Sequence, residues 1–399
     1  MRLALTTNAR LYKNSKGEYY TSAVYGYPFF KRYLNVFEEI KLIAHVERVD
    51  DQKINGMLRV DGERLSVYEI FFPHGKLNYI KNYQRINREL KYALNDVDAV
   101  ILRVPDQLAF QVYKQIRGRI PLAIEVTSHS WELFRRGTTK KSIFRPFIRI
   151  YWHHMQKKLC KNANGTAYVT KKYLQQDYPY QVGEKYFTTY YTSADIDEDW
   201  FYTSRRQPNK NEVRLIHVAT SIGGTGKGHK ELLIAAGELL KKGHPIKVVL
   251  IGGDVLNSAN KQIVEQYGLQ NNIEFKGTLN KKQIQQELSN ADIFVFPSYT
   301  EGLPRAVIEA MAAGLPCVAA QLPGIKELVD KKWLVPVKDS TLLVEKLEEF
   351  IKNEDLRIEV GRLNRENAKE YGIVNITKKR VEFYTKLKNL SEQNKNEKN

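Results

Sequence analysis

Cysteine is almost absent from this chain of 399 residues, in which only Cys160 and Cys317 occur. They lie far apart, and neither has a histidine or a second cysteine at the spacing of metal ligands. The sequence therefore predicts two reduced structural cysteines, without a disulfide framework or a zinc site. Long apolar runs are also missing, since no stretch approaches the roughly 20 residues that a membrane-spanning helix needs. The N-terminus turns polar after a few residues and lacks the features of a secretory signal, which predicts a cytoplasmic protein.

Positive charge is what the chain has in excess. Its 63 lysines and arginines against 45 aspartates and glutamates give a formal net charge of +18. Such a surplus predicts an anionic partner: nucleic acid, a membrane surface or a phosphorylated substrate. Charge alone does not choose between these, but we find no recognisable nucleic-acid-binding module.

Short apolar runs alternate with helical segments along the chain, which is the pattern of βα units and parallel sheets. Helices are expected, for example, at residues 230–242 and 281–288. Strands are expected in the first half at residues 2–6, 41–46, 98–104, 121–126 and 165–170, and in the second half at residues 213–219, 247–252, 273–276, 292–296 and 317–320.

This pattern predicts two α/β domains, residues 1–197 and 198–374. The division falls in an acidic stretch that a polar one follows, a composition typical of linkers. A basic amphipathic run, residues 375–390, predicts a C-terminal helix that packs back toward the first domain. Residues 391–399 contain no apolar side chain and predict a disordered tail.

The most informative segment, residues 291–316, reads as a buried strand, a loop and a helix. The strand ends at Pro297, the helix starts at Pro304, and Gly314 and Pro316 stop it. The helix N-terminus is thus expected at the carboxyl end of a parallel sheet, where open α/β folds bind ligands and free N–H groups attract phosphate.

Two carboxylates, Glu301 and Glu309, frame this helix. At about 1.5 Å per residue they lie roughly 10 Å apart, too far for an acid and a base that act on one bond. The spacing suits carboxylates that hold hydroxyl groups at opposite ends of a long ligand. The alternative is a pair of ordinary surface glutamates.

The Glu301-x7-Glu309 pattern, between Pro297-Ser298 and Gly314-Leu315-Pro316, resembles the donor-binding signature of the family-4 retaining glycosyltransferases. The resemblance extends over essentially the whole second half. It implies the GT-B fold, two Rossmann-like doubly wound parallel-sheet domains that face each other across a cleft. By this resemblance Glu301 contacts the donor sugar and Glu309 the ribose hydroxyls, and the sugar and diphosphate meet the backbone of Gly302, Leu303, Pro304 and Arg305.

A glycine-rich loop, residues 219–229, is a second candidate. Its glycines allow close approach to phosphate, and Lys227 supplies charge. A Walker A loop is excluded because Gly228 stands where that motif needs Ser or Thr, and Ser221 stands where it needs its first glycine. The alternative for Lys227 is a surface lysine in a flexible loop.

Family-4 enzymes usually carry an arginine a few residues before the Lys-Gly pair, and both cations bind the diphosphate. Here that position falls at Thr220 or Ser221, so Thr225 or Arg305 is the candidate substitute. Gly252 and Gly277 follow expected strands and are further donor-binding candidates, with a plain turn as the equal alternative for Gly252.

The first half resembles the family in shorter elements. Gly17 is the candidate for close approach to the donor diphosphate. His129 lies near where the family places a histidine beside the reacting sugar, and a surface histidine is the alternative. Glu301, Lys227 and His129 are therefore the predicted catalytic residues.

Residues 133–164 contain no acidic side chain and interleave cations with aromatic residues. This pattern predicts a surface that lies on anionic lipid, with a solvated basic helix as the alternative. The candidates for the membrane or acceptor side are Arg103, Arg145, Arg149, Lys157 and Lys158.

Two Asp-x-Asp triplets, at residues 96–98 and 195–197, are interpreted as surface loops, so no metal and no cofactor are expected. The sequence then predicts a retaining, metal-independent glycosyltransferase, peripheral at the inner face of the membrane. It would move a sugar from a nucleotide-sugar donor, with UDP favoured by the resemblance, to a lipid-linked or saccharide acceptor in bacterial surface polysaccharide synthesis. The alternatives are a sugar-nucleotide epimerase and a non-catalytic sugar-nucleotide-binding partner.

Overall fold

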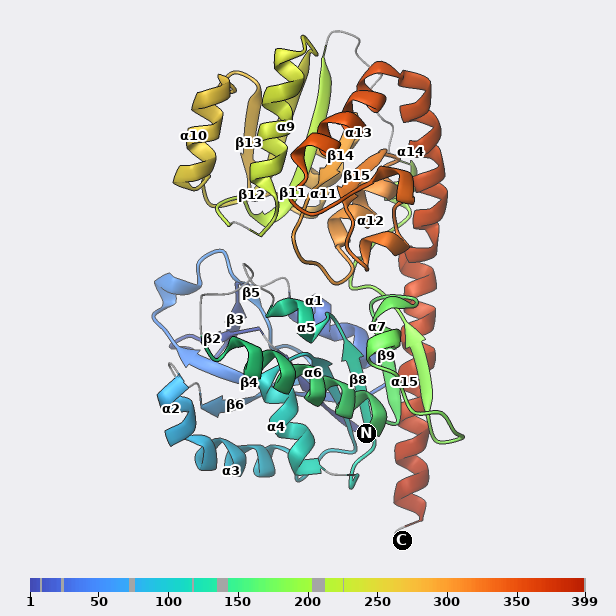
Figure 1. Ribbon diagram of the computed structural model, residues 1–399. Helices are drawn as coiled ribbons and strands as arrows, with labels where there is room; N and C mark the ends of the chain where they lie inside the picture. Colours follow the sequence, from blue (N-terminus) through green and yellow to red (C-terminus); the bar gives the residue numbers. More distant parts are fainter. Residues whose placement is uncertain are drawn as a thin grey trace. The chain divides into compact units, whose positions relative to one another are not determined.

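The computed structural model describes residues 1–7, 9–22, 25–71, 76–116, 118–134, 143–202, 212–224 and 226–397. They form two compact units (Figure 1). The first unit comprises Met1–Trp131, Pro146–Tyr191 and Lys378–Asn399, and the second comprises Glu132–Arg145 and Thr192–Thr377. Within the described residues, no helix combines the length and the apolarity needed to cross a bilayer.

The first unit is built on a largely parallel sheet in which β1 lies between β4 and β7. Beyond β7 follow β8, β9 and β10; β6 pairs with β4, and β2, β3 and β5 extend the other end. The strands are β1 (Arg2–Thr6), β2 (Leu11–Lys13), β3 (Tyr19–Thr21), β4 (Glu39–Arg48), β5 (Leu58–Arg59), β6 (Leu65–Phe71), β7 (Ala99–Val104), β8 (Leu122–Val126), β9 (Gly165–Tyr168) and β10 (Phe187–Tyr190).

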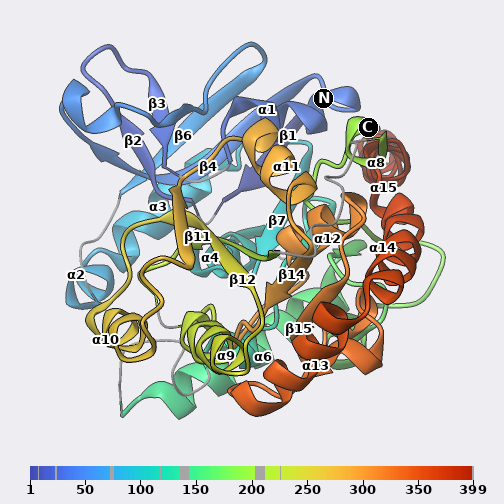
Figure 2. The same cartoon turned by 90° about the horizontal axis from the view of Figure 1, so that it is seen from above.

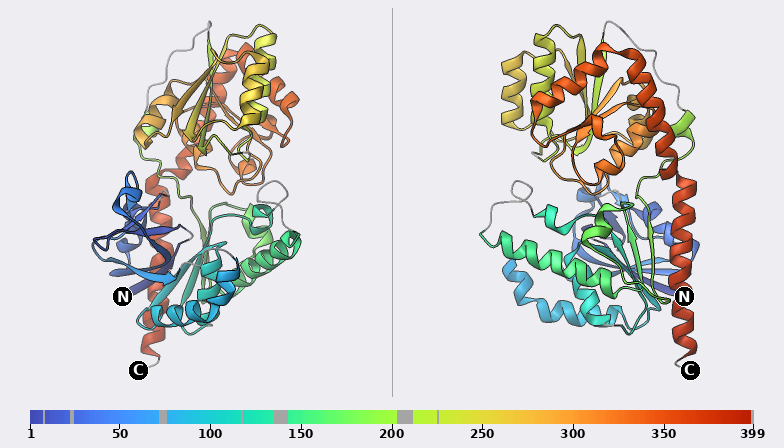
Figure 3. Two further views of the ribbon diagram at one scale, coloured as in Figure 1. Left: turned by 90° about the vertical axis from the view of Figure 1, so that its left-hand side faces the viewer. Right: turned by 45° about the vertical axis from the view of Figure 1, so that its right-hand side comes forward.

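Helices cover both faces of this sheet, because side chains of successive strand residues point to opposite faces. Leu102 of β7 and Ile124 of β8 pack into the cluster formed with α3, α4 and α6, whereas Arg103 and Glu125 lie on the other face, where Tyr384 of α15 (Ile373–Asn396) reaches Glu125. Figure 3 shows the C-terminal helix, in red, beside the strands of this unit. The helices are α1 (Tyr27–Phe30), η1 (Lys31–Asn35), η2 (Asp51–Ile54), α2 (Lys76–Lys81), α3 (Tyr83–Ala93), α4 (Gln107–Ile116), α5 (Ser130–Leu133), α6 (Arg145–Asn162) and α7 (Tyr173–Asp177).

The second unit has a parallel sheet in the order β13-β12-β11-β14-β15-β16. Its strands are β11 (Val213–Ser221), β12 (Ile246–Gly253), β13 (Ile273–Gly277), β14 (Ile293–Phe296), β15 (Cys317–Ala320) and β16 (Leu334–Val335). Figure 2 shows α9, α10 and α13 on one side of the sheet and α11, α12 and α14 on the other. The helices are α8 (Asp199–Tyr202), α9 (His229–Lys241), α10 (Ser258–Tyr267), α11 (Lys281–Ser289), α12 (Arg305–Ala312), η3 (Ile325–Glu327), η4 (Lys331–Trp333), α13 (Ser340–Lys352), α14 (Glu354–Ala368), η5 (Lys369–Tyr371) and α15 (Ile373–Asn396).

The predicted fold class is confirmed, and each strand expected from the sequence is present. The expected disordered tail is wrong for most of its length, because α15 continues to Asn396. Ser391 is buried, and Lys395 forms an ion pair with Asp98 at 2.6 Å. These contacts give the polar residues partners that their composition does not reveal. Residues 398 and 399 lie outside the described residues.

A buried polar cluster joins α15 to the first sheet. The Glu125 carboxylate accepts hydrogen bonds from the hydroxyls of Tyr33, Tyr191 and Tyr384 at 2.9, 2.9 and 3.0 Å. It also pairs with the Arg103 guanidinium at 2.6 Å. Burial would raise the pKa of Glu125, but Arg103 and the hydroxyls outweigh it and hold this pKa below its usual value.

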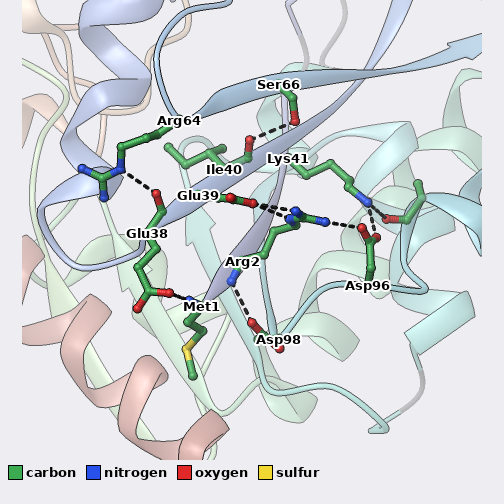
Figure 4. Close-up of polar contacts among 11 residues, drawn as sticks. Met1, Arg2, Glu38, Glu39, Ile40, Lys41, Arg64, Ser66, Asp96 and Asp98 are labelled. Carbon is green, nitrogen blue, oxygen red and sulfur yellow. Dashed lines mark hydrogen bonds and ion pairs between the residues drawn. The ribbon is translucent and has the colours of Figure 1, made fainter.

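Ion pairs occupy the first Asp-x-Asp triplet, at the amino ends of the parallel strands (Figure 4). Asp96 pairs with both Arg2 and Lys41, and Asp98 accepts the backbone N–H of Arg2 at 2.7 Å. Arg2 also pairs with Glu39 at 2.6 Å. This edge of the sheet is opposite to the carboxyl ends, where α/β folds bind ligands.

Candidate functional site

The candidate site lies where the strand order of the second sheet reverses direction. β11 and β14 are neighbours at its centre, while β12 and β13 continue to one side and β15 and β16 to the other. In doubly wound sheets, ligands bind outside the carboxyl ends of the two strands at this point. The loop after β11 contains Lys227, and the loop after β14 contains Glu301, so both predicted segments meet here.

Backbone contacts hold these two loops together. The Tyr299 N–H donates to the carbonyl of Gly226 at 2.9 Å, and the Ser298 hydroxyl oxygen lies 3.3 Å from the same carbonyl oxygen. Gly228 has φ +72°, and a Cβ there would overlap the Pro297 carbonyl. Glycine is therefore required at residue 228 for the loop after β11 to reach the end of β14.

The predicted catalytic pair is formed across this junction. Lys227 Nζ lies 2.6 Å from Glu301 Oε1, and the Ser298 hydroxyl donates to the same oxygen at 2.8 Å. The Lys227 and Glu301 side chains are 34% and 14% exposed. Ser298 was missed by the sequence reasoning; a small polar residue directly after a buried strand is the signal that could have indicated it.

Two helix N-termini flank the pair. α9 begins after Gly228 and α12 after Pro304, and neither has a side chain that caps its first N–H groups. Such groups carry partial positive charge and are suited to bind phosphate. Arg305, the first residue of α12, is exposed and has no hydrogen bond or ion pair to any described residue. The site can therefore accommodate an anion.

Glu309 differs from Glu301 in that no described residue hydrogen-bonds to or pairs with its carboxylate. It lies on α12 and is partly buried. Burial raises the pKa of Glu309, although Arg305 and Lys281 act in the opposite direction. A carboxylate left in this state is suited to accept hydrogen bonds from a ligand's hydroxyl groups.

The other predicted residues of the second unit lie along the carboxyl edge of its sheet. Gly252 belongs to the end of β12, and Gly277 is the last residue of β13. Gly302 contacts Gly324, at which a Cβ would overlap the Gly302 carbonyl, and Leu303 and Pro304 are buried. Thr225 lies outside the described residues.

Two buried histidines lie beneath the Lys227 loop. His217 of β11 contacts His229, the first residue of α9, edge to face at 4.8 Å between ring centroids. Burial lowers the pKa of His217 to about 3, and it also lowers the pKa of His229. Both rings are therefore neutral at pH 7 and add no charge to the site.

In the first unit, His129 is 5% exposed and engaged at both ring nitrogens. Its Nε2 lies 2.9 Å from Asp177 Oδ2, and its Nδ1 lies 2.9 Å from the Tyr178 hydroxyl and 3.1 Å from the Trp131 N–H. The Tyr178 hydroxyl also contacts His153 Nδ1 at 3.0 Å. A catalytic role for His129 stays a prediction, and these partners fix the ring in the protein.

Gly17 has φ +83° in the turn between β2 and β3, a conformation that favours glycine without any ligand. Arg103, a candidate for the membrane or acceptor side, is buried and does not lie on an exposed surface, so only a role on the acceptor side stays a prediction. Its side chain is only 8% exposed and pairs with Glu125. The carbon of its guanidinium lies 5.1 Å from the ring centroid of Tyr25 and 4.7 Å from that of Phe29.

The remaining basic candidates belong to α6. Lys157 and Lys158 are exposed, whereas Arg149 stacks on Trp131 at 3.9 Å and donates to its carbonyl. Arg145, at the start of the helix, is partly buried. Large apolar side chains of this segment are exposed beside them: Ile143, Phe144, Phe147, Ile150 and Tyr151. The cations at residues 135, 136, 140 and 141 lie outside the described residues.

Comparison with solved structures identifies the class of fold. The crystal structure of Anabaena HepE in complex with UDP and glucose has a TM-score of 0.66 to this chain at 14% identity, and the comparison covers 96% of this chain and 98% of that one. The fold, two α/β units that are each built on a parallel sheet, is the GT-B fold of its structural neighbours.

Sequence comparison finds a family match in the second unit. Residues 201–370 match the model of the glycosyl transferases group 1. Protein CapJ of Staphylococcus aureus is 27% identical over 368 residues, 90% of this chain and 89% of CapJ. The putative colanic acid biosynthesis glycosyltransferase WcaL of Salmonella typhimurium is 34% identical over 133 residues, 31% of this chain and 33% of WcaL. The second unit therefore matches the glycosyl transferases group 1, and the chain as a whole is similar to CapJ.

Proposed function

We propose that this glycosyltransferase moves a sugar from a UDP-sugar to a lipid-linked or saccharide acceptor, with retained configuration and without a metal ion, in the synthesis of a bacterial surface polysaccharide. The observation that carries the proposal is the Lys227–Glu301 pair, which lies between two uncapped helix N-termini at the strand switch point. HepE was solved with UDP and glucose, and WcaL is named for colanic acid biosynthesis, which supports the same chemistry here.

In this proposal the donor lies along the N-terminus of α12. Glu309 accepts hydrogen bonds from the two ribose hydroxyls, for which its carboxylate has unused capacity. Glu301 holds a hydroxyl of the donor sugar and keeps Lys227 in place. The backbone of Gly302 to Arg305 meets the diphosphate at the positive end of the helix dipole.

The chemical step needs stabilisation of the leaving diphosphate. The acceptor hydroxyl attacks the anomeric carbon as the bond from that carbon to the diphosphate oxygen breaks, and the hydroxyl proton passes to an oxygen of the leaving diphosphate. Negative charge grows on the departing UDP, and Lys227 with the N–H groups of α9 and α12 stabilises it electrostatically. Glu301 already neutralises the charge of Lys227, so the departing UDP needs a second cation. Arg305 supplies it in this proposal.

The test is isothermal titration of UDP, GDP and ADP into the wild-type protein and Glu309→Ala. We expect UDP to bind the wild type and to lose about tenfold or more in affinity in the variant, as two hydrogen bonds to a charged group disappear. Glu345→Ala, which removes an exposed glutamate of α13, is the matched control. Wild-type protein that binds none of the three nucleotides would end the proposal.

A transfer assay separates the alternatives. A transferase releases UDP from a UDP-sugar when acceptor is added, whereas an epimerase converts the sugar without acceptor. A partner without catalytic activity binds donor with no turnover.

We also propose that α6 contacts anionic lipid through Lys157, Lys158 and the exposed aromatic side chains beside them. Each cation near an anionic surface contributes about 1 kcal/mol. Replacement of both lysines by glutamine should therefore weaken binding to phosphatidylserine vesicles about tenfold or more. The same replacement at Lys241 and Lys352, exposed in the second unit, should have no effect. Equal vesicle binding by both double variants would show that Lys157 and Lys158 do not contact the lipid.

A further inference from the structure

The first unit contains a cavity of about 650 Å³ that the proposed donor site does not use. It is lined by residues 13–17 at the β2–β3 turn and 48–50 at the end of β4, and we call it the hairpin pocket. We propose that the hairpin pocket binds a phosphate or diphosphate group of the acceptor. This inference rests on the proposed function, since only a transferase has an acceptor.

The turn that forms one wall is held in a fixed shape. The Asn14 side chain accepts the Glu18 N–H at 2.8 Å and donates to the Glu18 carboxylate at 2.9 Å. Ser15 donates both its backbone N–H and its hydroxyl to Asp51, at 3.0 and 2.9 Å. The opposite wall is tied to this one, because the Val49 N–H donates to the Lys13 carbonyl at 3.0 Å. These bonds give the pocket a stable outline before any ligand binds.

The charges on its walls favour an anion. Lys13 is neutralised by Glu69, with 2.6 Å between Nζ and Oε1. Lys16 and Arg48 are exposed, and neither makes a hydrogen bond or ion pair to another described residue. Against them stands only the exposed Asp50 among the lining residues, so the pocket carries a surplus of one positive charge. A planar guanidinium and a flexible ammonium together are suited to phosphate oxygens.

The size and place of the pocket point to the acceptor. Its volume falls within the roughly 300–1,000 Å³ typical of small-ligand pockets, which is room for a sugar phosphate as well as for a bare ion. The donor diphosphate already has Lys227, Arg305 and two helix N-termini in the second unit. Gly17, which lines the pocket, was predicted to approach that diphosphate, but the proposed function places the contacts of the donor diphosphate in the second unit. We therefore assign the pocket to the other substrate, and the UDP affinity of a pocket variant tests this choice.

The experiment is titration of inorganic pyrophosphate into the full-length protein saturated with UDP. Wild-type protein should bind it, and the Lys16→Ala/Arg48→Ala double variant should lose at least about tenfold in affinity, since charged hydrogen bonds disappear. Lys53→Ala is the matched control, because Lys53 is exposed close by on η2 and pairs with Glu47 without lining the pocket. UDP affinity and thermal stability should be equal in all three proteins.

Each other outcome decides the question. If the double variant and the wild type bind pyrophosphate equally well, the hairpin pocket is not the anion site. The same follows if the UDP-saturated wild type binds no pyrophosphate. A loss of UDP affinity in the double variant would assign the pocket to the donor diphosphate and refute its assignment to the acceptor. If the wild type binds no UDP, the proposed function fails and the acceptor assignment fails with it, while pyrophosphate binding lost in the double variant would still identify an anion site.

Discussion

Each unit places a glutamate and a cation together on its parallel sheet, but the two pairs have different surroundings. The Arg103 and Glu125 side chains are 8% and 6% exposed, and three tyrosine hydroxyls fill the remaining capacity of the carboxylate. The Lys227 and Glu301 side chains are 34% and 14% exposed, and among the residues that the structure describes only the Ser298 hydroxyl adds a side-chain hydrogen bond to this pair. A fully satisfied buried pair is suited to hold a structure, whereas a partly open pair can exchange its protein contacts for a ligand.

The sharpest test of the structural pair is Glu125→Ala. The variant should lose about 3–5 kcal/mol in free energy of unfolding, because the buried Arg103 charge and the three hydroxyls lose their acceptor. Urea unfolding measures this loss. Tyr384→Phe, which removes one donor and leaves the ion pair, should cost about 1 kcal/mol. An equal effect of both variants would show that the buried ion pair is not what makes Glu125 important.

Glu301→Ala should instead affect catalysis. We expect kcat to fall about 10²–10³-fold, because Glu301 holds the donor sugar and positions Lys227, and loss of one group that acts on developing charge has an effect of this size. The free energy of unfolding should change by about 1 kcal/mol or less, because a partly exposed pair is screened by solvent. Lys227→Ala combined with Glu301→Ala should lower kcat by less than the product of the single effects, since both residues act on one ligand. If Glu301→Ala instead lost several kcal/mol in free energy of unfolding and kept the wild-type kcat, the Lys227–Glu301 pair would be structural and not catalytic.

The neutral histidines beneath the Lys227 loop make the second unit sensitive to acid. Burial holds the pKa of His217 at about 3 in the folded protein, below the unfolded value of about 6.5. The stability that His217 contributes is thus present above about pH 6.5 and is lost as pH falls toward 3, by about 1.4 kcal/mol per pH unit. His217→Gln should flatten the dependence of unfolding free energy on pH between 6 and 4. His154→Gln, at an exposed position, should leave it unchanged.

Glu309→Gln should produce the smallest change, a gain in stability. Because burial raises the pKa of Glu309, the stability linked to this group is present at low pH and lost as pH rises through its folded pKa. A neutral amide removes that loss, so we expect the melting temperature without ligand to rise by about 1–3 °C at pH 7. The two proteins should melt alike at pH 4. A lower melting temperature for the variant at pH 7 would mean that Glu309 stabilises the empty site.

The strands at the centre of both sheets could be predicted because they are buried on both faces and read as continuous apolar runs. β6 (Leu65–Phe71) was missed, since partly exposed residues such as Ser66 and Glu69 interrupt its apolar pattern. The helix that begins after Pro304 and the carboxylates around it were predictable from proline, glycine and spacing. Arg103 was misjudged because its partner Glu125 lies on the next strand, and nothing local indicates that the two meet.

The division of the first unit along the chain also has a consequence for biosynthesis. Tyr384 lies on α15, whose residues from Lys378 onward belong to the first unit, although the ribosome makes them after the whole second unit. Until α15 is made, Glu125 of the nascent first sheet therefore lacks the Tyr384 hydroxyl, and the face that α15 later occupies is exposed to solvent. During that interval both segments of the second unit, Glu132–Arg145 and Thr192–Thr377, are already complete and can fold, so the order of folding need not follow the order of translation.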